Sequence, residues 1–499
     1  MYGCLYLTPV KSAFKYVLLV LVIIFSVSSC RKDIILSDTN AKLRFSQDTI
    51  IFDTVFVTVG SITEVFKVYN DYNEDIHISS LRLATGNSSR YRLNVDGMPG
   101  KIFSDVEIRA KDSLFIFVEV TIDPHSISTP FVVTDSIVFI TNGNIQDVDL
   151  VAWGQNAVFH KPPPGNNAQL ICNEVWIDTL PHVIYGYVIV NDNCSLTIEK
   201  GTNVFLHPGS GIIVLTGGTL IVNGEKDSVV TFTGDRLEAD YREVPGQWDR
   251  IHLSNISNAN LNGSSVISQG THNSIINYAV IKNGNIGLLV DTVYGNMSDP
   301  GYTLTLNNTI IENMAGSGLV ARGTKIKSGN CVFANASQYA AALAYGGRYD
   351  FRHCTFANFW NFSNRTTPTL LINNFFDTYL RPIDSAYFGN CVVYGNIADE
   401  LGLDSMNTSG SHFNYFFDHS LVQAGSSIPI TSVHFNTCVV NQDPKFKNTD
   451  NNNYELDTLS NAKNKGIISI SLPDYQFDIK GIDRNLYLPP DCGAYERPQ

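Results

Sequence analysis

Cys331-Val-Phe-Ala-Asn335 and Cys354-Thr-Phe-Ala-Asn358 are two copies of a short motif that recurs through the second half of the chain. Each copy begins with a small residue, continues with residues that favour strands, and in most cases reaches an asparagine within a few positions. The other five copies begin at Ala279, Thr309, Cys391, Ser420 and Cys438. The first residues of consecutive copies lie 30, 22, 23, 37, 29 and 18 residues apart, a self-similarity that predicts a solenoid of stacked coils.

The motif also predicts which residues face the interior of the solenoid. Successive residues of a strand point to opposite faces, so the first and third residues of each copy share one face. The first position becomes a ladder of small residues that includes Cys331, Cys354, Cys391 and Cys438, and the third becomes a ladder of Ile, Phe and Val. Both ladders suit a narrow interior. The asparagine follows the strand where the chain must turn, because Asn tolerates a left-handed backbone.

Motifs outside the repeat resemble a known family. Gly246-Gln-Trp-Asp-Arg-Ile251 is similar to a turn that often follows the first coils of right-handed parallel β-helices of the pectin-lyase-like superfamily. Three later motifs resemble the closing segment of β-helix proteins of the choice-of-anchor type: Asp443-Pro-Lys-Phe446, Asp478-x-x-Gly481-x-x-Arg484 and Cys492-Gly-Ala-Tyr-Glu496. The resemblance implies an all-β chain with a right-handed parallel β-helix over residues 169–445 and a closing segment over residues 446–499. A fold does not by itself imply an activity.

Residues 45–157 have a different pattern, with short alternating runs separated by Asn, Asp, Gly and Pro. The clearest runs are Thr54–Val59, Glu64–Tyr69, Leu114–Val120 and Ser136–Ile140. Such spacing predicts a β-sandwich. Val68-Tyr-Asn-Asp71 and Val151-Ala-Trp-Gly154 resemble immunoglobulin-like modules that serve as spacers or interaction domains. The proline-rich residues 158–168 predict a short, stiff linker between sandwich and β-helix.

The N-terminus predicts a lipid anchor. Lys11 and Lys15 precede an apolar run over residues 16–27, and Val27-Ser-Ser-Cys30 resembles the lipobox of bacterial lipoproteins. The resemblance implies a signal peptide over residues 1–29, a lipid on Cys30, a tether over residues 30–44 and attachment to the outer membrane. The alternative is an uncleaved anchor helix in which Cys30 is incidental. Which face of the membrane the protein occupies stays open.

The net charge of the mature chain limits the classes of partner that we expect it to bind. Removing two lysines with the signal peptide leaves 32 basic residues against 47 acidic residues, a formal net charge of −15. An acidic surface repels nucleic acids and anionic polymers. Neutral glycans or other envelope proteins are therefore the expected partners. The length of the mature chain also exceeds what one core supports, so at least two domains are expected.

Seven cysteines remain after Cys4 and Cys30. Cys331, Cys354, Cys391 and Cys438 lie on the interior ladder and are predicted to be reduced and buried, because an inward Cys acts as a small hydrophobe. Cys172 and Cys194 are one coil apart and are either stacked thiols or a disulfide. No pair has the spacing of a zinc site, and the sequence predicts neither a metal nor a cofactor.

The outward positions of the repeat do not predict a catalytic groove. Polysaccharide lyases on this fold need acids that bind calcium, or a pair of bases, on one parallel sheet. Here the outward residues are mostly small and apolar, as in Val332, Ala334 and Ala357. The one charged neighbouring pair, Lys282 and Glu312, is predicted to be a cross-strand ion pair and not an acid–base couple.

Two stretches supply candidate ligand-binding residues. The first contains two cations, a carboxylate and an imidazole, at Arg348, Asp350, Arg352 and His353. The alternative is a purely structural role, in which these groups lie at a strand edge and pair with one another. The second is the long interval after Cys354, where insertions on a solenoid tend to carry function. Its candidate residues are Trp360, Phe362, Arg365, Tyr379 and Arg381. The alternative for the second stretch is that its aromatic rings form a small core inside the loop.

Three classes of function remain. The sequence favours a non-catalytic, glycan-binding or adhesive lipoprotein of the cell envelope. The first alternative is a polysaccharide lyase or glycoside hydrolase, which the fold and the location permit. The second is a scaffold subunit of an outer-membrane complex, for which the apolar outward column at Val332, Ala334 and Ala357 is a candidate docking face.

Overall fold

The computed structural model describes residues 34–57, 60–122, 131–257, 273–291, 301–406 and 412–498. The predicted signal peptide and Cys30 lie outside the described residues. Within these ranges no helix is both long and apolar enough to cross a membrane. The chain divides into two compact units, one that ends at Gln155 and one that begins at Asn156.

The first unit is an immunoglobulin-like β-sandwich of two sheets, each with five strands among the described residues. The strands of one sheet, in spatial order, are β1 (Arg44–Phe45), β3 (Glu64–Tyr69), β8 (Ser113–Val120), β5 (Tyr91–Val95) and β6 (Met98–Gly100). Those of the other are β2 (Thr49–Phe56), β10 (Asn144–Gln155), β9 (Phe131–Thr141), β4 (Ile76–Leu83) and β7 (Ile102–Ile108). Alternate residues of β8, such as Ile116 and Val118, are fully buried between the sheets. The Tyr91 hydroxyl joins the sheets by donating to the Val133 carbonyl at 2.8 Å.

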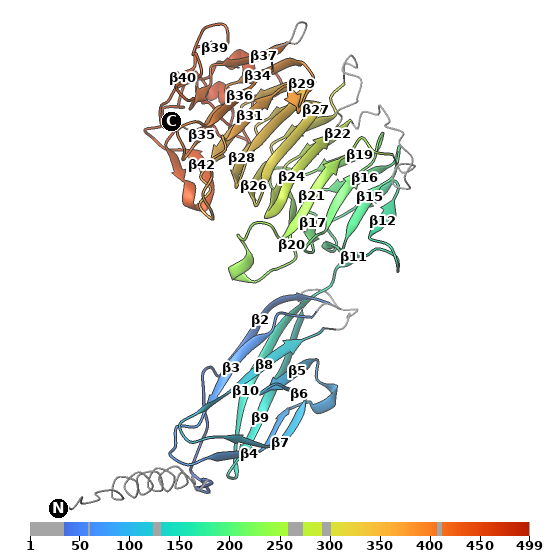
Figure 1. Ribbon diagram of the computed structural model, residues 1–499, viewed down its shortest axis with the longest axis vertical. Helices are drawn as coiled ribbons and strands as arrows, with labels where there is room; N and C mark the ends of the chain where they lie inside the picture. Colours follow the sequence, from blue (N-terminus) through green and yellow to red (C-terminus); the bar gives the residue numbers. More distant parts are fainter. Residues whose placement is uncertain are drawn as a thin grey trace, which may run out of the picture. The chain divides into compact units, whose positions relative to one another are not determined.

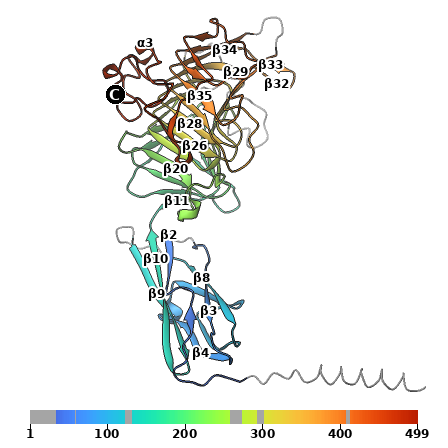
Figure 2. The ribbon, with the colours of Figure 1, turned by 90° about the vertical axis from the view of Figure 1, so that its left-hand side faces the viewer.

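The second unit is the predicted right-handed parallel β-helix, and two long parallel sheets form it (Figure 1). We call the sheet that contains the repeated motif the motif sheet. Its strands are β11 (Val158–His160), β14 (His182–Ile184), β17 (Asn203–Leu206), β20 (Val230–Gly234), β23 (Ala279–Lys282), β26 (Ile310–Met314), β28 (Val332–Ala336), β30 (Thr355–Asn358), β35 (Val392–Gly395), β38 (Leu421–Val422) and β40 (Val439–Val440). Figure 2 shows several of these strands one above another, from β11 to β35.

The other sheet, called the long sheet, contributes two strand segments to each coil. Its strands are β12 (Ala168–Ile171), β13 (Glu174–Trp176), β15 (Tyr187–Val190), β16 (Ser195–Glu199), β18 (Gly211–Val214), β19 (Thr219–Asn223), β21 (Trp248–Leu253), β22 (Ser274–Asn277), β24 (Gly284–Asp291), β25 (Leu304–Asn307), β27 (Ser317–Gly329), β29 (Ala341–Arg352), β31 (Leu370–Asn373), β34 (Ile383–Gly389), β36 (Leu401–Asp404), β37 (Phe413–Asp418) and β39 (Phe435–Asn436). β27 and β29 each span both segments and bend at Gly323 and Gly346, whose positive φ suits glycine. Each coil therefore has three faces.

The first coil begins earlier than the sequence indicated. Residues 158–168 were predicted to be a linker, but Val158–His160 pairs in parallel with β14. His160 is buried there, and its imidazole stacks on Trp176 with ring centroids 4.2 Å apart. An aromatic stack thus closes this end of the interior, and proline content alone did not reveal it.

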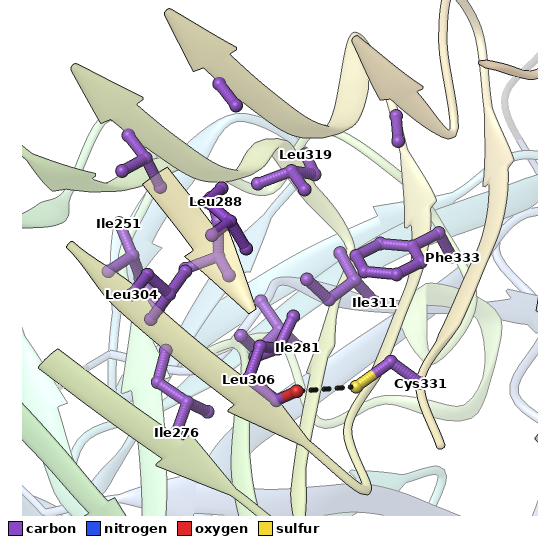
Figure 3. Packing of buried hydrophobic residues seen from close by; sticks show 14 of the residues in the cluster. Ile251, Ile276, Ile281, Leu288, Leu304, Leu306, Ile311, Leu319, Cys331 and Phe333 are labelled. Carbon is purple, nitrogen blue, oxygen red and sulfur yellow. Dashed lines mark hydrogen bonds between the residues drawn. The ribbon is translucent and has the colours of Figure 1, made fainter. Parts of the chain in front are cut away.

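The interior ladder is confirmed by the strand register. Ile281 pairs with Ile311, then Phe333, then Phe356, and the same column continues through Val393 to Val422 and Val440. The rings of Phe333 and Phe356 stack with centroids 5.0 Å apart. Figure 3 shows Ile281, Ile311 and Phe333 converging with leucines of the long sheet. The interior among the described residues is thus lined by packed apolar side chains.

The cysteines sort into two kinds. Cys331, Cys354 and Cys391 are free and fully buried, and Cys438 is free and half-buried. The Cys331 thiol donates to the Leu306 carbonyl at 3.4 Å (Figure 3), which satisfies it without oxidation. Cys172 and Cys194 form a disulfide, which settles the alternative that the sequence left open.

The recurring asparagines turn the chain as predicted at four of the five copies. Asn283, Asn313, Asn335 and Asn441 have positive φ. Asn358 does not have this backbone, and its buried amide instead donates to the Ala336 carbonyl at 2.9 Å.

The outward apolar column of the motif sheet is covered by the chain itself. Residues 446–498, the closing segment, contain the hairpin of β41 (Phe446–Asn448) and β42 (Asn453–Leu456) and the short helix α3 (Ile468–Ser471). Val332, Ala334 and Ala357 are fully buried against Tyr454, Ile479 and Ala494 of this segment. Figure 1 shows β42 beside β28 and β35. The predicted docking face for a partner is therefore wrong, because the closing segment already occupies it.

Candidate functional site

The structure separates the first group of candidate residues. Alternation along β29 places Asp350 and Arg352 on its outer, half-buried side, and the turn that follows places His353 beneath the closing segment. His353 is fully buried, and its Nε2 lies 2.7 Å from Ser471 Oγ and 2.9 Å from the amide nitrogen of Asn390. Burial holds the pKa of His353 well below its usual range, so this imidazole is neutral. Its role is to join the coil to the closing segment.

The charged residues of this group bond locally. The Arg352 guanidinium donates to Asp350 at 3.0 Å and lies 5.7 Å from the Tyr387 ring centroid. Arg348 lies over the ring of Tyr302, 5.3 Å from its centroid. Both contacts are on the outer side of the long sheet, and neither brings these side chains together with the second group of candidates. The interpretation of mutually satisfied charges fits these residues best.

The second group divides between two separate insertions of one coil. Trp360, Phe362 and Arg365 lie in the loop between β30 and β31. Tyr379 and Arg381 lie in or next to the hairpin of β32 (Phe375–Phe376) and β33 (Tyr379–Leu380), which connects β31 with β34. Tyr379 is 67% exposed, and the Arg381 guanidinium is 5.8 Å from the Tyr345 ring centroid. The hairpin residues lie at another corner of the coil from the loop.

Arg365 is a buried structural residue. Its guanidinium donates to both carboxylate oxygens of Glu400, at 2.8 and 2.6 Å, and to the Asn358 carbonyl at 2.9 Å. Both side chains are almost completely buried. Such a bidentate pair holds the loop against the coil and leaves no part of Arg365 for a ligand.

Trp360 and Phe362 differ in exposure. Trp360 is 6% exposed, and its indole N–H donates to Ser363 Oγ at 2.8 Å. Phe362 is 57% exposed, and its ring centroid lies 5.1 Å from that of Trp360. The loop therefore has a small core, as one interpretation of the sequence held, and also presents one free aromatic face.

Both rings line a pocket of about 270 Å³ on the outer side of the motif sheet. We call it the Glu312 pocket. Five parts of the chain build it: β26 with Glu312, β28 with Asn335, the loop between β20 and β21 with Glu243, the loop with Phe362, and the 3₁₀ turn in the closing segment with Asp450. The lining residues include three acids, several asparagines and no Lys, Arg or His.

Asparagines of the repeated motif hold the pocket together. The Asn283 amide donates to the Arg242 carbonyl at 2.8 Å, and the Asn313 amide donates to the Glu243 carbonyl at 2.7 Å. Asn335 accepts from the Phe359 N–H at 2.9 Å and donates to Asn452 of the closing segment. The residues that turn each coil thus also anchor the three loops around the pocket.

Glu312 has an unusual environment for a carboxyl group. It pairs in register with Lys282 as predicted, but the Lys282 ammonium instead bonds Glu243, with Nζ 2.7 Å from Oε1. The predicted Lys282–Glu312 ion pair is therefore wrong, because the loop before β21 supplies a competing carboxylate. Among the described residues, no hydrogen bond or ion pair reaches the Glu312 carboxyl. Burial, with a smaller effect of Glu243, raises the pKa of Glu312 to about 7.

The acids of this pocket illustrate what the sequence did and did not reveal. The repeat marks Glu312 as an outward residue and favours a structural charge there. It does not mark Glu243 or Asp450, because they belong to a non-repeating loop and to the closing segment. The only signal for them is the length of the insertion between β20 and β21 and the polar turn Thr449–Asn451.

Comparisons with known proteins give little further guidance. No protein-family model matches the chain, and no curated protein matches it. The catalytic domain of a GH87 α-1,3-glucanase, solved in complex with nigerose, is 9% identical with a TM-score of 0.20, over 75% of this chain and 88% of that chain.

Two other solved structures match shorter stretches. A family 123 glycoside hydrolase from Clostridium perfringens is 12% identical with a TM-score of 0.18, over 26% of this chain and 26% of that chain. The periplasmic chaperone SfaE is 10% identical with a TM-score of 0.17, over 23% of this chain and 58% of that chain. Less than two thirds of either of these two chains is covered. These similarities identify neither a family nor an activity, so function is inferred from the pocket itself.

Proposed function

We propose that the chain is a lipoprotein of the outer membrane, anchored through Cys30, that binds a short neutral glycan in the Glu312 pocket. The observation that carries the proposal is the combination of one exposed aromatic face with a polar, cation-free lining. A sugar ring offers an apolar face that stacks on an aromatic ring and hydroxyl groups that bond to carboxylates and amides.

The size of the pocket supports a small ligand. Its volume of about 270 Å³ is just below the ~300–1,000 Å³ of typical small-molecule sites. A single sugar residue at the end of a chain is therefore the expected occupant, with the rest of the glycan in solvent. Phe362 supplies the stacking face, and Asn335 and Asn313 keep the polar walls in place.

The charge of the pocket supports a neutral ligand. Glu243 and Asp450 are exposed acids at its rim, and the described lining has no cation to neutralise a uronate or a sulfate. The net charge of the mature chain repels anionic glycans in the same sense.

The test uses the soluble chain from Lys32 onward on a glycan array that contains neutral, amino and uronic sugars. We expect binding to neutral glycans and none to uronates. Replacing Phe362 with Ala is expected to weaken binding by about 1–3 kcal/mol, the range for one aromatic contact at an interface. Phe376 is 73% exposed on the β32–β33 hairpin and does not line the pocket, so Phe376→Ala is the matched control. Equal losses in both variants would contradict the assignment of the site.

The anchor is tested separately. Cys30→Ala in the full chain is expected to abolish incorporation of a fatty-acid analogue and to release the protein from membranes. Label retained by the variant would contradict the lipobox.

A further inference from the structure

We propose that the Glu312 pocket also hydrolyses the glycan that it binds, with Glu312 as the proton donor to the glycosidic oxygen and Glu243 as the second carboxylate. The inference rests on the proposed function, because it needs a sugar in this pocket. It adds an activity and assigns the roles of two residues.

The first argument is that the two carboxyl groups have opposite environments within one pocket. Glu312 projects from a strand beneath the closing segment, faces Tyr454 and Tyr495, and has no bonding partner among the described residues. Glu243 has a side chain that is 56% exposed and is held by the Lys282 ammonium at 2.7 Å. Burial raises the pKa of Glu312, whereas the Glu243 carboxyl lies in water beside an ammonium group. Glycoside hydrolysis uses two carboxyl groups whose environments differ in this way.

Burial and the neighbouring charged groups together raise the pKa of Glu312. Lys282 on β23 opposes protonation, Glu243 favours it, and burial is the largest effect. The phenols of Tyr454 and Tyr495 stay neutral, since burial raises the pKa of each well above its ordinary value. Asp450 at the rim adds negative charge. The Glu312 carboxyl is therefore still protonated in about half of the molecules at pH 7, where a free carboxyl would have lost its proton.

The second argument is that a proton donor in this position has a defined task. The Glu312 proton moves to the glycosidic oxygen, the bond from C1 to that oxygen breaks, and its electron pair leaves with the alcohol. Either a water molecule activated by Glu243 or the Glu243 carboxylate itself attacks C1, and one water is consumed in both cases. The anomeric configuration of the first product, read by NMR, distinguishes the two routes.

The third argument concerns the shape of the site. The Phe362 loop and the Thr449–Asn451 turn both line the pocket, together with the loop that carries Glu243. A pocket of this size accepts the end of a glycan better than its middle. We therefore expect single sugars to be released from the ends of neutral oligosaccharides.

The experiment uses the chain from Lys32 onward, the neutral oligosaccharides that bind on the array, and the 2,4-dinitrophenyl glycosides of their terminal sugars. Glu312→Gln is expected to lower kcat on the oligosaccharides by about 100-fold or more, the usual effect of losing a general acid. On the dinitrophenyl glycosides the loss is expected to be far smaller, because this leaving group departs without protonation. A structural defect would slow both substrates equally.

A matched control and a pH profile complete the test. Glu238 lies in the same loop as Glu243, bonds Arg236 at 3.0 Å and does not line the pocket, so Glu238→Gln is expected to keep full activity while Glu243→Gln loses it. The rate on oligosaccharides is expected to fall as the pH rises above about 7, as Glu312 loses its proton.

The outcomes separate the two proposals. Binding without any product from the wild-type chain would overturn catalysis and leave glycan recognition intact. No binding to any neutral glycan would overturn both. Hydrolysis that survives Glu312→Gln on every substrate would overturn the role of Glu312.

Discussion

Glu400, which is fully buried, and Glu312, which is half-buried, show how a structural carboxyl in the β-helix differs from a candidate functional one. Glu400 is fully buried, bonds Arg365 twice and accepts from Thr369 and the Ile397 N–H. Glu312 lines a pocket, and none of the described residues donates a hydrogen bond to it. Burying a charge costs free energy unless the charge is paired. Glu400 is paired and holds the loop in place, whereas burial raises the pKa of the unpaired Glu312. A buried acid thus points to function only when its partners are counted.

The strongest way to test this contrast is to remove the partner of Glu400. Arg365→Met is expected to lower the free energy of unfolding by about 3–5 kcal/mol, because it leaves a buried carboxylate unpaired. The double variant Arg365→Met/Glu400→Gln should recover part of this loss. Chemical denaturation of the chain from Lys32 onward measures both. Glu312→Gln is the counterpart and is expected not to lower stability at neutral pH, because it removes the cost of ionising a carboxyl whose pKa is raised in the folded state. A loss as large as that of Arg365→Met would erase the distinction.

Trp360 and Phe362 allow the same comparison, between a structural and a candidate binding residue, within one loop. Trp360→Ala is expected to cost about 3 kcal/mol of stability through the cavity it leaves, because its ring is almost fully buried. Phe362→Ala is expected to change stability by less than about 0.5 kcal/mol, as for an ordinary surface position. Thermal melting of both variants provides the measurement. If Trp360→Ala melts like the wild type, the loop has no core.

Raised carboxyl pKa values predict the pH dependence of stability. Burial, together with Asp491, raises the pKa of Glu496 to about 8, since three acids share the single buried Arg484. Burial raises the pKa of Glu312 to about 7. A carboxyl that binds its proton more tightly in the folded state stabilises fully at pH values below about 4 and loses this contribution as the pH rises through its folded pKa.

The melting temperature is therefore expected to fall by several degrees between pH 6 and pH 9. Glu496→Gln should flatten this fall, and Glu312→Gln should flatten it less. A melting temperature that rises over this range would contradict the assigned protonation states.

The last prediction concerns the oxidation state of the cysteines and involves no change in stability. In the chain from Lys32 onward, alkylation under denaturing, non-reducing conditions is expected to label Cys331, Cys354, Cys391, Cys438 and Cys492 and to leave Cys172 and Cys194 unlabelled. Intact mass gives the count. Any further unlabelled cysteine would contradict the reduced ladder.

The fold could be predicted from the sequence because its information is local and repeated. Five positions of the motif predict the strand, its interior residues and the turn that follows. Aligning the copies then gives the strand register from Ile281 to Val440. The left-handed asparagines follow from the same copies.

The site could be predicted only in part, because its walls come from segments without a repeat. Phe362 and Trp360 were identified by composition, but nothing in the sequence showed that Arg365 meets Glu400 or that Lys282 meets Glu243. Charged residues that lie 35 and 39 positions apart were joined by insertions whose paths the motif does not specify. The covered outward column failed as a prediction for the same reason, since the closing segment folds back over it.

The closing segment also limits where coils can be inserted into or deleted from the sequence. Solenoids commonly gain or lose coils, because each coil contacts only its neighbours. Here side chains of one segment pack against many coils, from Ile310 and Val332 to Leu421 and Val439. Adding or deleting a coil within this span would move all later coils out of register with the closing segment. The closing segment therefore fixes the number of coils in this span.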